Sequence, residues 1–155
     1  MKDEGKTSKQ LITELEKEFI LDSQLEHVIY QDREHRILWP NLAACQSVEA
    51  EREELIGRYC YEIWPKHSER CEDCPVALAM KTGQQQESEQ TTPDGRTWFI
   101  RGSPVRDASG QIVGAIEVTQ EITQRVRYEE TLRQRAEELD ALQETVLDIT
   151  TQHDL

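Results

Sequence analysis

The sequence lacks an apolar segment long enough to cross a bilayer, since no apolar run approaches the roughly 20 residues that such a helix needs. Residues 1–7 also lead into no apolar stretch of the kind that follows the start of a signal peptide. Both absences predict a cytoplasmic protein with no membrane contact from this segment. Thiols stay reduced in that compartment, so the four cysteines are expected to be free, redox-sensing or metal-binding rather than joined in structural disulfides.

Basic residues are scarce relative to acidic ones. The chain has 18 Lys and Arg against 31 Asp and Glu, which gives a formal net charge of -13. An acidic surface repels phosphate groups, so the composition argues against binding to nucleic acid or to anionic lipid.

Signatures of catalysis are missing as well. There is no Gly-rich phosphate-binding loop, no Ser or Cys beside an obvious base, and no phosphoacceptor histidine in a suitable helix. The chain itself is therefore expected not to be an enzyme.

The residues that are present predict an α+β fold. Ser8 is expected to cap an amphipathic helix that carries an apolar stripe from Leu11 to Ile20. Short helices are expected between the second and third strands, the last of them between Pro75 and Gly83. Alternation, β-branched residues and turn signals predict five strands, at residues 28–30, 36–39, 86–92, 97–105 and 112–118.

A long C-terminal helix is expected after Thr123. Its apolar residues follow steps of 4, 3, 3, 4 and 3, a heptad pattern with one phase slip. A parallel two-chain coiled coil would bury this stripe, whereas the alternative is an amphipathic helix packed on its own domain. The stripe consists of Leu132, Ala136, Leu139, Leu142, Val146 and Ile149.

Several motifs, in this order and spacing, resemble the PAS domain, the small sensory fold of bacterial signalling proteins. One departure is His35, at a turn where the family usually has Gly, and another is Glu121 in place of the family's terminal Asp. The motifs are Ile37-Leu38-Trp39-Pro40-Asn41, Glu54-Leu55-Ile56-Gly57-Arg58, Pro93-Asp94-Gly95-Arg96 and Glu121-Ile122-Thr123.

The resemblance implies a five-stranded antiparallel sheet with short helices on one face. It divides the chain into an N-terminal amphipathic helix (1–24), a PAS sensor domain (25–123) and a signalling helix (124–155) that runs into the start of a following domain. It implies a homodimer through the flanking helices and a parent protein that is a sensor histidine kinase or, next, a diguanylate cyclase. The domain would sense a small ligand, a redox state or a metal, and the alternative is a ligand-free dimerisation scaffold.

The most unusual feature is a cysteine pattern, C-x10-C-x2-C-P, formed by Cys60, Cys71 and Cys74, and a subgroup of PAS domains shares it. A thiol at the start of a helix is favoured as thiolate, the form that binds metals and attacks disulfides. Cys45 or His67 would be the fourth ligand of a zinc ion, and Cys45 that of an iron–sulfur cluster. A thiol–disulfide switch and inert cysteines are the alternatives. His27 and His35 are expected to be exposed turn residues.

Two further sites are predicted. Trp39, Trp64, Trp98 and Tyr61 are candidates to line a small-molecule pocket, although packing in the core is the simpler interpretation of the tryptophans. Flavin and haem are not expected as cofactors, because the residues that hold them in related sensors are missing. The resemblance further implies a signal junction between the last strand and the helix, formed by Glu121, Ile122, Thr123 and Arg96.

Overall fold

The computed structural model describes residues 7–64, 66 and 68–152. The chain divides into two compact units, residues 1–90 with 98–121 and residues 91–97 with 122–155. The first unit contains most of the sheet and all the short helices, and the second contains a hairpin turn and the long helix α6 (Thr123–Gln152). None of the helices in the described ranges has both the length and the apolar character needed to span a bilayer.

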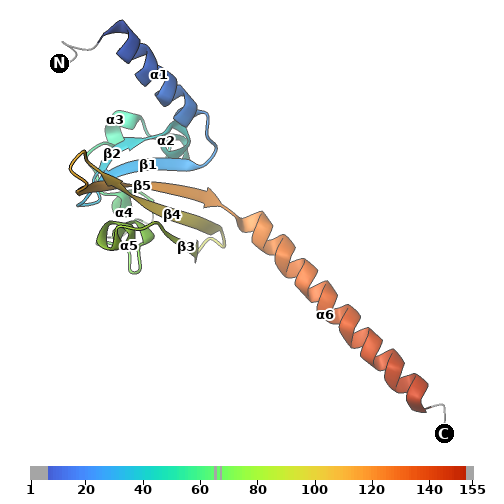
Figure 1. The fold of residues 1–155 in the computed structure, drawn as a ribbon. Coiled ribbons are helices and arrows are strands. Elements are labelled where there is room, and N and C mark those ends of the chain that lie inside the picture. The colour runs from blue at the N-terminus through green and yellow to red at the C-terminus, as the bar shows by residue number, and fades with distance from the viewer. Residues whose placement is uncertain (1–6, 65, 67, 153–155) are drawn as a thin grey trace. The chain divides into compact units, whose positions relative to one another are not determined.

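Five strands form one open sheet in the order β2-β1-β5-β4-β3 (Figure 1). The pairs β1–β2, β1–β5 and β4–β5 are antiparallel. This arrangement confirms the predicted five-stranded α+β architecture, and each strand lies where the sequence placed it. The strands are β1 (His27–Asp32), β2 (Ile37–Pro40), β3 (Gln86–Thr91), β4 (Thr97–Arg106) and β5 (Ile112–Glu121).

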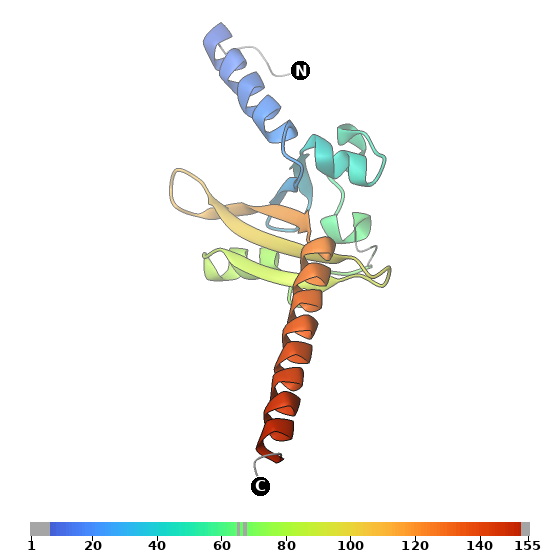
Figure 2. The same cartoon turned by 90° about the vertical axis from the view of Figure 1, so that its right-hand side faces the viewer.

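Three short helices pack on one face of the sheet: α2 (Leu42–Ser47), α3 (Arg52–Leu55) and α4 (Cys60–Ile63) (Figure 2). Ile29 of β1 points to this face and is 1% exposed. It belongs to a buried cluster with Ala44 of α2, Leu55 of α3 and Ile63 of α4. Burial of these apolar side chains holds the helices to β1 and β2.

Helix α5 (Pro75–Thr82) covers the same face farther along the sheet. In the strand register Ile29 stands opposite Glu117, and Glu117 stands opposite Gly102, so all three share one face. A Cβ atom on Gly102 would lie 2.6 Å from the Cα atom of Val76, so the start of α5 approaches β4 as closely as the backbones allow. This close approach brings the residues that open α5 next to Glu117 of β5.

Thr7 caps helix α1 (Ser8–Asp22). The sequence analysis had assigned this role to Ser8, and that assignment is wrong. The Thr7 side chain accepts from the backbone N–H of Gln10, and the Gln10 side chain accepts from the backbone N–H of Thr7. This reciprocal pair of hydrogen bonds is a capping box, and it is formed by Thr7 and Gln10 without Ser8. The apolar stripe of α1 is exposed to solvent, with Phe19 76% exposed.

The C-terminal end of α1 is fixed to the domain by Arg52 of α3. The Arg52 guanidinium donates to both carboxylate oxygens of Asp22, at 2.8 and 3.0 Å, and also to Glu18. Its Nε donates to the carbonyl of Pro40 at 3.0 Å, and its Cζ atom lies 4.9 Å from the ring centre of Trp39. These contacts are partly buried, so they stabilise the attachment more than an exposed ion pair would.

Candidate functional site

Two turns bring Cys60, Cys71 and Cys74 to the helix-covered face of the sheet. Cys60 opens α4, and its backbone N–H donates to the carbonyl of His35 at 3.1 Å. Cys74 is the residue before α5, where Pro75 occupies the first helical position because its missing N–H costs nothing there. We refer to these three residues as the thiol cluster.

The three thiols lie close enough to influence one another's ionisation. Burial is the main cause that raises the pKa of Cys60, and the charges of Glu117, Cys74 and Cys71 raise it further. Burial, followed by the charges of Cys74 and Glu117, raises the pKa of Cys71. Burial also raises the pKa of Cys74, although the backbone amides of Val76 and Ala77 oppose that rise. The cluster is therefore protonated at neutral pH.

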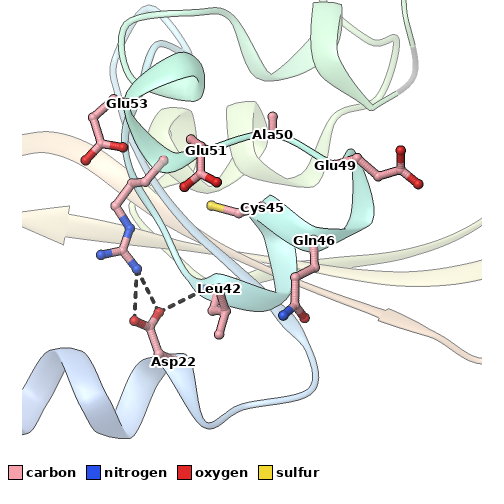
Figure 3. Close-up of a pocket in the computed structure, with 9 residues that line it drawn as sticks. Asp22, Leu42, Cys45, Gln46, Glu49, Ala50, Glu51 and Glu53 are labelled. Atoms are coloured by element: carbon pink, nitrogen blue, oxygen red, sulfur yellow. Dashed lines mark hydrogen bonds and ion pairs between the residues drawn. The ribbon is translucent and has the colours of Figure 1, made fainter.

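Cys45 belongs to the buried cluster against which Cys60 packs, and it also lines a cleft of about 560 Å³ beside α2 and α3 (Figure 3). Figure 3 shows its sulfur directed into this cleft, with Asp22 and Glu51 nearby. Burial raises the pKa of Cys45, and the charge of Arg52 opposes the rise. The largest charge influences on Cys45 are those of Arg52, Asp22 and Glu51, whereas those on Cys60 include Cys71 and Cys74.

The structure describes no arrangement of three His, Cys, Asp or Glu side chains that is ready to hold a metal ion. His67, one of the two predicted fourth ligands, lies outside the described residues. All four cysteines are free thiols. A metal at the thiol cluster would need three or four ligands at once, whereas a disulfide joins only two sulfurs.

A buried hydrogen-bond network that the sequence analysis missed lies next to the thiol cluster. Nδ1 of His35 lies 2.8 Å from Oε1 of Gln31, and Nε2 of Gln31 donates to Oε2 of Glu117 at 2.8 Å. The Thr119 hydroxyl donates to the other oxygen of Glu117 at 3.0 Å. Gln31 and His35 are 0% and 1% exposed. The sequence did contain a signal for this network, namely a polar residue at an inward position of each strand: Gln31 on β1 and Glu117 on β5.

His35 was expected to be an exposed turn residue, and this expectation is wrong. Its φ of 67° is the left-handed conformation that the family's Gly would adopt at this turn. The backbone is turned so that the imidazole points inward to Gln31. Burial, and then the charge of Arg70, lowers the pKa of His35 from 6.5 to about 4. His35 is therefore neutral under physiological conditions.

The four aromatic residues proposed for a ligand pocket have separate surroundings. Trp39 packs against Arg52, Trp64 donates from Nε1 to the Ser47 hydroxyl at 2.8 Å, and Trp98 contacts His27 at 5.7 Å between ring centres. Tyr61 stacks on Tyr59 at 5.1 Å. None of the four lines the cleft that contains Cys45. A shared small-molecule pocket remains a prediction.

The predicted signal junction falls mostly within the second compact unit. The backbone N–H of Ile122 donates to the carbonyl of Thr97 at 2.8 Å, and the backbone N–H of Thr97 donates to Oγ1 of Thr123 at 2.9 Å. Ile122 and Thr123 are 4% and 7% exposed. These contacts fix the first turn of α6 to the residue that begins β4.

The other two junction residues are exposed. Arg96 donates from Nε to Asp94 at 2.7 Å within the hairpin turn. The Thr92 hydroxyl and then the Arg96 side chain lower the pKa of Asp94 to about 2. Glu121 is the last residue of β5. The proposed roles of Arg96 and Glu121 in signal transmission remain predictions.

Several solved structures share this fold at low sequence identity. An RNA-binding light-oxygen-voltage receptor aligns with 91% of this chain and 41% of its own, at 18% identity and a TM-score of 0.61. The PAS domain of BvgS from Bordetella pertussis aligns over 83% of this chain and 99% of its own, at 17% identity and a TM-score of 0.58. A sensory box sensor histidine kinase from Vibrio cholerae aligns over 74% of this chain and 96% of its own, at 13% identity and a TM-score of 0.55.

No curated protein matches the chain by sequence. A family model does match it, and that model is described as the PAS fold. The match extends over residues 21–127, which include every strand, the helices α2–α5 and the start of α6. The chain belongs to the PAS fold family.

Proposed function

We propose that this PAS domain is the regulatory input module of a dimeric signalling protein and that the thiol cluster is its sensing element. Oxidation of two of the three thiols to a disulfide would be the signal. The observation that carries this proposal is the place of Cys60 at the start of α4 and of Cys74 just before α5, on the helix-covered face of the sheet that also carries Glu117 of β5. β5 ends at Glu121 and α6 begins at Thr123, so the strand beside the cluster continues directly into the long helix.

A sensor histidine kinase is the parent protein we propose, with a diguanylate cyclase as the alternative. The structural similarity to a sensor histidine kinase of Vibrio cholerae supports this choice by fold. Input modules of this kind act by changing the geometry of a dimer, since coupling requires an element with two arrangements that the signal biases differently.

The oxidation can be written as two thiol–disulfide exchanges with a low-molecular-weight disulfide. One cysteine thiolate attacks the disulfide and expels one thiol, and a second cysteine then attacks the mixed disulfide and expels the other. The protein loses two protons and two electrons, and the oxidant is reduced to two thiols. Because burial raises the pKa of all three cysteines, the exchange is expected to be slow at neutral pH.

The chain is expected to form one disulfide within the thiol cluster when treated with oxidised glutathione. The intact mass should fall by two hydrogens, and peptide mapping should find the bond between two of Cys60, Cys71 and Cys74. The thiols of the reduced, folded chain should react with Ellman's reagent more slowly than those of the unfolded chain. Their rate should rise up to tenfold per pH unit until the raised pKa is reached. Cys45→Ser is the matched control and should leave the disulfide unchanged.

Elemental and optical analysis of anaerobically purified protein separates the alternatives. Stoichiometric zinc, or the visible bands of an iron–sulfur cluster, would replace the disulfide proposal with a metal site that uses the same cysteines. Three independent thiols that form no disulfide and bind no metal would leave a ligand-free dimerisation scaffold or a small-molecule sensor. In either case the thiol cluster would not be the sensing element.

The dimer is expected to form through α6. Its apolar stripe is exposed in the single chain, with Leu139, Leu142, Val146 and Ile149 at 57–62% exposure, and pairing two helices would remove these side chains from water. Removal of all residues after Gln124 should shift the protein from dimer to monomer in sedimentation experiments. Leu139→Glu with Leu142→Glu should have the same effect, whereas Glu138→Gln on the same helix should not. An unchanged oligomeric state would assign the interface to the exposed stripe of α1.

A further inference from the structure

Helix α1 is attached to the first compact unit through polar contacts near its C-terminal end. None of its 15 residues is buried, and only Glu18 and Asp22 are half-buried. Both carboxylates bind Arg52 of α3, and Asp22 accepts with its two oxygens at 2.8 and 3.0 Å. Oδ1 of Asp22 also accepts from the backbone N–H of Leu42, the first residue of α2, at 2.8 Å. Detachment of α1 would therefore break hydrogen bonds and ion pairs but would expose no buried side chain of α1.

Arg52 is also held by contacts that do not involve α1. Its Nε donates to the carbonyl of Pro40 at 3.0 Å, and its Cζ atom lies 4.9 Å from the ring centre of Trp39. Both partners belong to β2. A planar guanidinium that is fixed in this way keeps its remaining N–H groups directed at the place of the α1 carboxylates. The receiving side of the attachment is thus preorganised.

Residues 23–26 form the link between α1 and β1, and they belong to no helix or strand. Asn41 fixes the β1 end of this link, because its side chain donates to the carbonyl of Glu26 at 2.9 Å and accepts from the N–H of Val28 at 2.9 Å. Of the four hydrogen bonds that the structure describes for this side chain, one goes to α1, at the carbonyl of Leu21. Movement of α1 about this link leaves the other three in place.

The end of α1 also closes one side of the cleft that Cys45 lines. Asp22 is the residue that α1 contributes to the lining of this cleft, and the others come from α2, α3 and the residues between them. Cys45 is only 6% exposed, although its sulfur is directed into the cleft (Figure 3). Withdrawal of Asp22 opens this wall, so solvent and small reagents gain access to the sulfur when α1 moves away.

We infer that α1 is a strap that Arg52 holds closed beside the Cys45 cleft and that opens while the sheet and the short helices stay folded. Opening breaks the contacts of Arg52 with α1 and bends residues 23–26, whereas the contacts of Arg52 with β2 persist and allow the strap to close again. The helix, with its exposed apolar stripe, thereby has two positions on one folded unit. This device is independent of the thiol cluster, and Cys45 serves only to report the open position.

Replacement of Arg52 by Met keeps an unbranched side chain and removes the groups that bind α1. N-ethylmaleimide should alkylate Cys45 about tenfold faster or more in this variant, because a gated thiol reacts in proportion to the open population. Peptide mapping of the full chain reads each cysteine separately. Burial raises the pKa of Cys45 and the Arg52 charge opposes that rise, so loss of the charge alone would slow the reaction. Arg58→Met, at an exposed position, is the matched control and should leave the rate unchanged.

Hydrogen exchange in the wild-type chain tests the strap even if Arg52→Met fails to fold. The amide of Leu42 donates to Asp22 of α1, whereas the amide of Ala44, in the same helical turn, donates to Asn41. NMR should find a protection factor about tenfold or more lower for Leu42, with little dependence on denaturant concentration, because opening of the strap exposes little surface. Ala44 should depend clearly on denaturant, since its partner stays with the unit.

Two results would overturn the strap. The first is equal protection and equal denaturant dependence for the two amides, which would mean that α1 moves only when the whole unit opens. The second comes from a folded Arg52→Met variant, in which the Cys45 rate is unchanged or slower, or rises together with the rates of Cys60, Cys71 and Cys74. A rise at Cys45 alone supports the strap, and it does so whether or not the thiol cluster forms a disulfide.

Discussion

Replacement of Asn41 by Ala is expected to lower the free energy of unfolding by about 3–5 kcal/mol. Asn41 is 0% exposed and uses both ends of its side chain. Its oxygen accepts from the backbone N–H of Val28 at 2.9 Å and of Ala44 at 3.1 Å. Its nitrogen donates to the carbonyls of Leu21 at 3.1 Å and Glu26 at 2.9 Å. One side chain thus joins the end of α1, the start of β1 and the first turn of α2.

The large effect is expected because Ala leaves four backbone groups without these partners in a site with little room for water. Chemical denaturation of the variant measures the loss. Asn41→Asp keeps the oxygen acceptors and removes the donors, so its stability should fall between wild type and Ala. Gln46→Ala, an exposed position on the same helix, should change the stability by less than about 0.5 kcal/mol. Equal stability of wild type and Asn41→Ala would show that Asn41 does not connect these elements.

Acidification is expected to destabilise the protein by about 3 kcal/mol through His35 alone. Burial, and then the Arg70 charge, lowers the pKa of His35 to about 4, whereas the unfolded chain has the ordinary value of 6.5. Between these values the unfolded chain binds a proton that the folded chain does not. The contribution is therefore fully present above pH 6.5 and is lost as the pH falls to about 4.

Other groups titrate nearby, so the measurement must isolate His35. Asp32 raises the pKa of His35 as an opposing, smaller influence. Glu117, linked to His35 through Gln31, has a pKa raised by burial, and its stability contribution is lost as the pH rises, the opposite sign. The free energy of unfolding should be measured from pH 7.5 to 4 in wild type and in His35→Asn, since Asn tolerates the left-handed conformation. The variant should show a smaller loss of stability on acidification, and parallel curves would contradict the assignment.

The sequence predicted the strands well because each one is marked by local chemistry. Residues 112–118 are rich in β-branched side chains, and the turns before and after residues 97–105 contain Pro93-Asp94-Gly95 and Gly110. The short helices were also predicted, since Pro75 and Gly83 mark the ends of α5. Capping at the first helix was misassigned by one residue, from Thr7 to Ser8, because either hydroxyl can cap a helix and only the backbone geometry distinguishes them.

The candidate site was predicted only in part. The C-x-x-C pattern and its position before a helix identified Cys71 and Cys74 from the sequence. The pattern does not say where Cys45 lies, because its place depends on how α2 packs: Cys45 lies on α2 and lines a cleft beside α2 and α3. The roles of His35 and Gln31 were missed, since a histidine in a turn and a glutamine in a strand are usually exposed.

By itself the sequence determined the class of fold, the order of its elements and the cysteine pattern, because periodicity, turn residues and spacing are properties of neighbouring residues along the chain. Only the tertiary structure decided which polar groups meet. Gln31 and Glu117 are 86 residues apart and hydrogen-bond because β1 pairs with β5 in one register. A slip of β1 by one residue would turn the Gln31 side chain to the other face of the sheet, away from Glu117. The buried network exists because strand pairing sets that register.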